Sequence, residues 1–185
     1  MYMRHTMVAV AFLMVACGGS SDTKPDKGAK GTSDDHAGSS RFDMNGDGVP
    51  DVWKYYAAVD GKDVLARKEF DINFDGKVDI WRYYNPEGKL TRDQMDMDFD
   101  GKVDVTSFYE DGKVTRKEVD LEFDDRPDLF KYFEDGQLVR VEGDSDNDGK
   151  VDYWEKYRGG KLYEIGSDED GDGQPDPDLW KRVEG

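Results

Sequence analysis

The feature that most constrains the fold is a short repeat that runs from the second quarter of the chain to its end. Matching segments begin at six aspartates, with steps of 28, 25, 24, 24 and 24 residues: Asp43, Asp71, Asp96, Asp120, Asp144 and Asp168. A short, regular period is typical of an array of supersecondary units, none of which buries a core alone. The sequence therefore predicts a six-unit repeat domain over residues 42–185.

Each unit consists of an acidic loop, an aromatic segment, a glycine turn and a charged segment. The aromatic segment at 79–84, DIWRYY, favours a strand. Pairs such as Asp111-Gly112 and Asp135-Gly136 follow, and they are strong hairpin signals. We expect an all-β fold in which about six hairpins form a meandering antiparallel sheet, with acidic loops along one edge. Helix–loop–helix pairs are the alternative, but no segment between the loops has a helical period.

An aromatic column recurs two residues after the aspartate that closes each loop. It contains Trp53, Trp81, Phe130 and Trp154, and Thr106 interrupts it. We expect the column to form the core, with a docking surface as the alternative. The return segments, with Leu, Arg and Gln or Glu at alternate positions, resemble MORN-variant hairpin repeats of bacterial envelope proteins. That resemblance implies a meandering sheet and no activity.

The acidic loops, numbered one to six along the chain, share the pattern D-x-[D/N/E]-x-D-[G/D]-x-x-D. Carboxylates this close repel one another unless a cation lies among them. Calcium takes six to eight oxygen ligands, and a glycine at the sixth position permits the sharp turn of a calcium loop. The pattern is similar to the calcium loops of EF-hands, dockerins and thrombospondin type 3 modules. The resemblance covers the loops alone and implies several bound Ca²⁺ ions.

By this resemblance, the metal ligands are the oxygen-bearing residues of five loops. In loop five they are Asp144, Asp146, Asp148, the carbonyl of Lys150, Asp152 and the closing Glu155. In loops one and six they are Asp43, Asn45, Asp47, Asp51, Asp168, Asp170, Asp172 and Asp176. In loops two and three they are Asp71, Asn73, Asp75, Asp79, Asp96, Asp98, Asp100 and Asp104. The end of loop six stays open between Asp176 and Asp178, because Asp178 precedes Trp180 as Asp51 precedes Trp53.

Loop four departs from the pattern. It has Glu122 at the third position, Asp125 in place of the glycine, and Arg126, whose charge competes with a cation. We expect this loop to bind calcium weakly or not at all. A metal-free hairpin is the alternative for all the loops, since Asp-Gly also forms two-residue turns. That alternative explains loop five poorly, because five acids converge there with Lys150 as the one base.

Composition narrows the choice of function. The net charge of −17 argues against a nucleic-acid partner. Cys17 and the two histidines, His5 and His36, all precede residue 42. The repeat domain therefore has no disulfide, no thiol or imidazole nucleophile and no such zinc ligand. Paired carboxylates of a polysaccharide hydrolase are the enzymatic alternative. We expect no enzyme, because the acids recur at repeated positions and do not form one asymmetric constellation.

The N-terminus is similar to that of a bacterial lipoprotein. Arg4 precedes an apolar run over residues 7–16, and the segment 14–17, MVAC, resembles a lipobox that ends at Cys17. The resemblance implies a cleaved signal peptide over residues 1–16, lipidation of Cys17 and, because Gly18 follows, an outer-membrane location. An ordinary secretory signal is the alternative. Residues 17–41 would then comprise the lipidated cysteine and a flexible linker rich in Gly, Ser, Asp and Lys.

These features together predict a calcium-binding lipoprotein of the bacterial envelope with a structural or interaction role. Calcium would stabilise the repeat array in the place of disulfides. The expected partners are calcium, the membrane through the lipid anchor, and an envelope protein or polysaccharide. A calcium buffer or sensor is the alternative, although sensors open a groove between paired helices and no helix pair is predicted.

Overall fold

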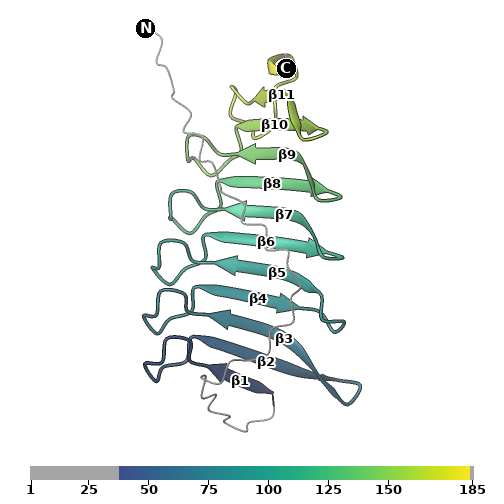
Figure 1. Ribbon diagram of the computed structural model, residues 1–185. Helices are drawn as coiled ribbons and strands as arrows, with labels where there is room; N and C mark the ends of the chain where they lie inside the picture. Colours follow the sequence, from purple (N-terminus) through teal and green to yellow (C-terminus); the bar gives the residue numbers. More distant parts are fainter. Residues whose placement is uncertain (1–37, 184–185) are drawn as a thin grey trace.

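The computed structural model describes residues 38–183 as a single twelve-stranded sheet. All strand pairs are antiparallel, and the order in the sheet follows the order in the chain from β1 to β12 (Figure 1). The all-β meander predicted from the repeat is therefore confirmed. The described residues contain no helix long and apolar enough to cross a membrane.

The strands are short and evenly spaced along the chain. They are β1 (Ser39–Phe42), β2 (Val52–Val59), β3 (Lys62–Phe70), β4 (Ile80–Tyr84), β5 (Leu90–Met95), β6 (Val105–Glu110), β7 (Lys113–Val119), β8 (Leu129–Glu134), β9 (Gln137–Gly143), β10 (Tyr153–Arg158), β11 (Lys161–Ser167) and β12 (Lys181–Arg182), with one 3₁₀ turn, η1 (Pro177–Leu179), before β12.

Tight turns and acidic loops alternate between successive strands. The loops therefore share one edge of the sheet and the turns share the other (Figure 1). In the turn between β6 and β7, Asp111 and Gly112 have φ values of 48° and 78°. Positive φ at both central residues matches the right-handed twist of the flanking strands. Along this edge, Lys113 Nζ forms a salt bridge with Asp135 of the next turn at 2.9 Å.

The sheet begins earlier than the sequence predicts. Residues 39–41 fall in the segment predicted as linker, yet they pair with Trp53–Tyr55 of β2. Strand pairing is made by backbone groups, so these polar residues add a strand without an apolar pattern. The predicted signal peptide over 1–16, lipidated Cys17 and the linker up to residue 37 lie outside the described residues.

The sixth unit does not form a complete hairpin. After its loop, η1 leads into β12, which pairs with β11 over only two residues. Trp180 lies over the last full strand: a Cβ added at Gly166 would come within 3.0 Å of the indole ring. Lys156 Nζ lies 3.4 Å from the centroid of the same ring. Trp180 therefore covers the C-terminal end of the sheet.

The aromatic column forms the expected core only in small part, because residues 38–183 make a single-layered sheet and supply no second layer to pack against. Among the described residues, Val52, Val141 and Trp154 are the buried hydrophobic side chains, and the other rings of the column are half-buried. The most completely buried large side chains are instead aspartates at the loop edge: Asp51, Asp71, Asp79 and Asp96.

Candidate metal centre

Loop three, between β5 and β6, shows how the aspartates shape the loop edge. Asp96 Oδ1 accepts the backbone N–H of Phe99 at 2.7 Å, and its Oδ2 accepts that of Gly101 at 2.7 Å. Asp104 Oδ2 accepts the N–H of Met97 at 2.6 Å. The first and ninth residues thus wind the loop around their own carboxylates. These bonds explain how aspartates can be buried, since the burial of unpaired charge is costly.

The same bonds recur in the other loops. In five loops the first aspartate accepts N–H groups from the fourth and sixth residues: Asp43, Asp71, Asp96, Asp144 and Asp168. In all six loops the ninth residue accepts the N–H of the second: Asp51, Asp79, Asp104, Asp128, Asp152 and Asp176. Asp176 is therefore the closing residue of loop six, and Asp178 lies in η1.

The winding forces the backbone into the left-handed region at two places in each loop. At the fourth position Phe74, Phe99 and Asn147 have φ values of 64°, 66° and 64°. At the sixth position five loops have glycine with positive φ, whereas loop four has Asp125 at 73°. A side chain in this region costs free energy unless local bonds hold it. The glycine of the repeat is thus explained by backbone geometry, and loop four carries strain that the others avoid.

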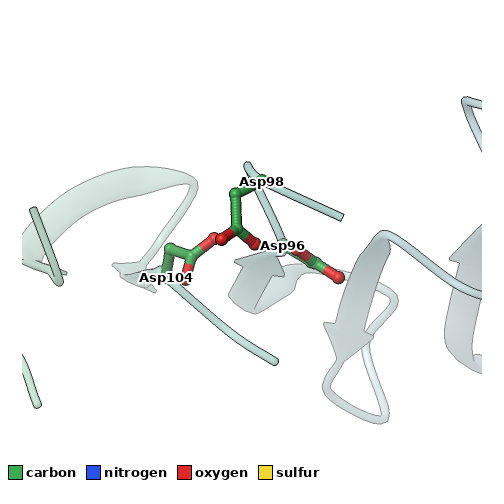
Figure 2. A group of neighbouring side chains, drawn as sticks. All are labelled: Asp96, Asp98 and Asp104. Atoms are coloured by element: carbon green, nitrogen blue, oxygen red, sulfur yellow. The ribbon is translucent and has the colours of Figure 1, made fainter. Parts of the chain in front are cut away.

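Three aspartates converge in each of loops three, five and six. Within each group, one oxygen from each carboxylate lies within 4.8 Å of the other two: Asp96, Asp98 and Asp104; Asp144, Asp146 and Asp148; Asp168, Asp170 and Asp172. Figure 2 shows the carboxylates of Asp98 and Asp104 meeting, with Asp96 beside them. Within residues 38–183, no lysine or arginine forms an ion pair with any of these nine carboxylates.

The pKa values of two of these aspartates are raised, and neighbouring negative charge is among the causes. Burial, together with repulsion from Asp98 and Asp96, raises the pKa of Asp104 above its ordinary value, although backbone N–H bonds oppose the change. The pKa of Asp170 is also raised: a bond from the Asp172 N–H lowers it, but the charge of Asp172 and burial outweigh that bond. A cation among these oxygens would relieve the repulsion.

Loops one and two contain an asparagine at the third position, and they lack such a triplet of acids. Asn45 Oδ1 accepts the N–H of Asp47 at 2.8 Å, and Asn73 Oδ1 accepts that of Asp75 at 3.0 Å. The same bond is made by Asp98 in loop three, at 3.1 Å. The amide oxygens therefore occupy the place of a carboxylate, and calcium accepts both ligand types.

In loop four, side-chain cations pair with two of the acids, Asp124 and Asp125. Arg126 donates to Asp124 Oδ2 from Nε at 3.1 Å and from Nη2 at 2.6 Å. This bond lowers the pKa of Asp124. From loop three, Lys102 Nζ lies 2.8 Å from Asp125, the residue that replaces the glycine. The guanidinium of Arg126 thus binds the carboxylate at the fifth position, Asp124. This pairing gives a physical reason to expect that loop four binds calcium weakly or not at all.

Glu155, predicted as the closing ligand of loop five, forms hydrogen bonds with tyrosines of the sheet. Glu155 lies on β10, opposite Val141 and Ile165. Its two carboxylate oxygens accept the hydroxyls of Tyr153 and Tyr157, at 2.7 and 2.6 Å. We therefore leave Glu155 out of the proposed ligand set. The side chain of Lys150, whose carbonyl is a predicted ligand, donates to the carbonyl of Gly171 at 2.7 Å.

Contacts between neighbouring loops were not predicted from the sequence. Asn147 Nδ2 of loop five donates to Glu122 Oε1 of loop four at 2.6 Å. The Lys102–Asp125 salt bridge joins loops three and four, and the Lys150–Gly171 bond joins loops five and six. The recurrence of lysine at the seventh position was the available signal, but only the sheet register shows that it reaches the next loop.

The sequence matches no known protein family and none of the curated proteins. Among solved structures, the GtfA/B complex is 18% identical over 49% of this chain and 18% of that chain, with a TM-score of 0.38. Accessory secretory proteins 1, 2 and 3 of Streptococcus pneumoniae are 15% identical over 66% of this chain and 20% of that chain, with a TM-score of 0.30. Likenesses this low do not extend to function.

Proposed function

We propose that this chain is a calcium-binding lipoprotein of the bacterial envelope, without enzymatic activity, whose ions stabilise the repeat array. The observation that carries the proposal is the convergence of three carboxylates in each of loops three, five and six, none of which forms an ion pair with a lysine or arginine among the described residues. Calcium is a hard cation that binds such oxygen-rich loops. We include loops one and two, where the single asparagine oxygen accepts a backbone N–H and would share this role with an ion.

The hydrogen bonds leave oxygens for an ion. In loop five, Asp146 and Asp148 each accept one backbone N–H, through Oδ1. Their Oδ2 atoms have no hydrogen-bond partner among the described residues, so both can face a cation. In Asp146 and Asp148 one carboxylate oxygen thus fixes the loop and the other is available to a metal, whereas Asp144 and Asp152 accept hydrogen bonds at both of their oxygens. Backbone carbonyls and water would complete the six to eight ligands of calcium.

Ions in five of the six loops suit a single-layered sheet that buries few apolar side chains. The loops lie in a row along one edge (Figure 1), and from loop two onward the first aspartate of each loop donates its N–H to the carbonyl of the ninth residue of the loop before it. An ion that fixes one loop therefore also fixes the strands on either side of it and the loop beside it. A stiff array displayed from a lipid anchor fits a structural or interaction role, with an envelope protein or polysaccharide as partner.

The calcium sensor remains the second reading from the sequence, but no observation favours it. Sensors convert ion binding into the opening of a helix pair. The regular elements within residues 38–183 are strands and one 3₁₀ turn, so these residues contain no such pair. The metal-free reading is the stronger competitor, because the first and ninth aspartates of each loop are already satisfied by backbone N–H groups.

Native mass spectrometry during a calcium titration separates these readings. For the protein from residue 18 onward we expect one ion for each of the five loops that keep the ligand set. Binding is expected near 10⁻⁴–10⁻³ M, roughly the range of extracellular calcium modules. The matched variant Asp146→Asn with Asp148→Asn keeps the shape of loop five and is expected to lose one ion. A protein that stays free of ions in millimolar calcium would refute the proposal.

Loop four offers a gain-of-function test. Asp125→Gly combined with Arg126→Lys restores the Asp-Gly-Lys sequence of loops two and three. It removes the guanidinium that holds Asp124, so we expect one additional ion in the mass spectrum. Asp125→Gly alone keeps the Arg126–Asp124 pair and is expected to leave the count unchanged. Equal counts for the parent and the double variant would show that Arg126 does not govern this loop.

A further inference from the structure

One face of the sheet carries two regular rows of side chains that cross the strands in register. The first row, called here the aromatic–acid row, consists of Trp53, Glu69, Trp81, Gln94, Thr106, Glu118, Phe130, Glu142 and Trp154. The second row, called here the arginine row, consists of Tyr55, Arg67, Tyr83, Arg92, Phe108, Arg116, Tyr132 and Arg140. Their members are two residues apart on each strand, so both rows face the same side.

In three of the four units of this row, the arginine is paired with a ring and an acid. Arg67 Cζ lies 4.2 Å from the ring centroid of Tyr55, and its Nε lies 3.0 Å from Glu69 Oε1. The Tyr55 hydroxyl also donates to Glu69, at 2.8 Å. The guanidinium is thus held between an aromatic face and a carboxylate. Such contacts stabilise a partly buried cation.

Two further units repeat this arrangement. Arg140 Nε lies 3.1 Å from Glu142 Oε1, and the Tyr132 hydroxyl donates to Glu142 at 2.9 Å. Arg116 likewise pairs with Glu118. In these units the carboxylate is supplied by the residue two positions after the arginine. The same position is therefore the expected place for an acid beside Arg92.

At Arg92 the acid is missing. Gln94 stands where the other units have glutamate, and it donates to Thr106 Oγ1 at 3.4 Å. Arg92 Cζ keeps its contact with the Tyr83 ring, at 4.1 Å. Its Nε is buried and has no hydrogen-bond partner within the described residues. Arg67 Nε is also without a hydrogen bond of good geometry, but it has Glu69 at 3.0 Å.

The aromatic ring is missing at the adjoining position. Thr106 pairs directly with Gln94 and takes the place held by a tryptophan or phenylalanine in the other strands of the column. The two departures from the repeat therefore coincide on neighbouring strands, β5 and β6, about 4.8 Å apart. On this face the carboxylate is absent at Gln94 and the ring is absent at the neighbouring Thr106. Both positions lie beside the guanidinium of Arg92, which has no acid partner among the described residues.

We propose that Tyr83, Arg92, Gln94 and Thr106 form a binding site for a cyclic carboxylate, with its ring over Thr106 and its carboxylate at Arg92. The ligand supplies the two groups that the repeat omits here. A buried guanidinium nitrogen without an acceptor costs free energy, and a ligand carboxylate removes that cost through a charge-assisted bond. A sugar acid and an aromatic acid share this chemistry. The site does not use the calcium loops, so it stands independently of the proposed function.

The test is nuclear magnetic resonance of the full-length chain in calcium-containing buffer, with the Arg92 Nε–H signal as the readout. We expect this signal to shift saturably with sodium glucuronate or sodium benzoate and not with the neutral analogues glucose or benzamide. A shift with glucuronate alone assigns a sugar acid, and a shift with benzoate alone assigns an aromatic acid. No shift with either acid, or an equal shift with the neutral analogues, overturns the proposal.

Two matched variants are expected to change ligand binding in opposite ways. Gln94→Glu supplies the carboxylate that the other units have, so binding is expected to weaken by about tenfold or more. Glu118→Gln removes the acid from Arg116 on the other side of Thr106, so a second responding Nε–H signal is expected. Both changes exchange groups of similar size, and melting curves check that the sheet is intact. Undiminished binding by the Gln94→Glu variant would overturn the proposal.

Discussion

Calcium is expected to raise the free energy of unfolding by about 2.7 kcal/mol for each loop held at a hundredfold excess over its dissociation constant. The carboxylates of Asp96, Asp98 and Asp104 converge only in the folded chain, so the ion binds the folded state and hardly the unfolded one. Because the loops are coupled along one edge, we expect the whole sheet to respond. The summed effect over several loops is larger than that of a typical point mutation.

The measurement is calorimetric melting of the protein from residue 18 onward, in calcium and in EGTA. Sodium chloride at matched ionic strength is the control, since screening alone weakens repulsion between exposed acids. The variant Asp146→Asn with Asp148→Asn is expected to lose the share of the calcium effect that belongs to loop five. Identical melting curves in calcium and in EGTA would leave the loops as self-sufficient turns.

The fold could be predicted because its signals are local. The Asp111-Gly112 turn and the loop pattern fix where the chain reverses, and a meander needs no long-range pairing information. The start at Ser39 could not be predicted, because β1 joins the sheet through its backbone and Ser39, Ser40 and Arg41 have no strand pattern. The expected aromatic core is found only at Trp154, for a different reason: the sequence does not reveal that residues 38–183 form one layer and supply no second one.

The candidate site could be predicted in its positions but not in its bonds. The spacing identified Asp144 and the other loop aspartates, yet it left Asp176 and Asp178 as alternatives until the bond from the Glu169 N–H to Asp176 resolved them. Glu155 followed from a resemblance to loops that lead into a helix, whereas here a strand follows and places it between Tyr153 and Tyr157. The burial of aspartates was not foreseen, because charged side chains are rarely buried.

The buried first aspartate of a loop is expected to matter more for folding than its exposed neighbour. Asp96→Ala removes the acceptor for the N–H groups of Phe99 and Gly101. Each hydrogen bond to a charged acceptor contributes about 1.5–3 kcal/mol, and water replaces part of the loss because Phe99 and Gly101 are exposed, so we expect a total loss of roughly 2–4 kcal/mol. Asp98→Ala removes one longer bond, from the Asp100 N–H at 3.1 Å, at an exposed position. Its cost is expected to be about 1 kcal/mol or less.

Urea unfolding in EGTA measures these changes without any contribution from calcium. Asp96→Asn then separates the hydrogen bonds from the charge. The amide keeps one acceptor oxygen for Phe99 or Gly101, and loss of the charge relieves the repulsion from Asp98 and Asp104. We therefore expect this variant to be closer in stability to the parent than Asp96→Ala. If the Asp96→Ala and Asp98→Ala variants unfold at the same urea concentration, the buried carboxylate does not hold the loop, and another interaction must wind the chain at this edge.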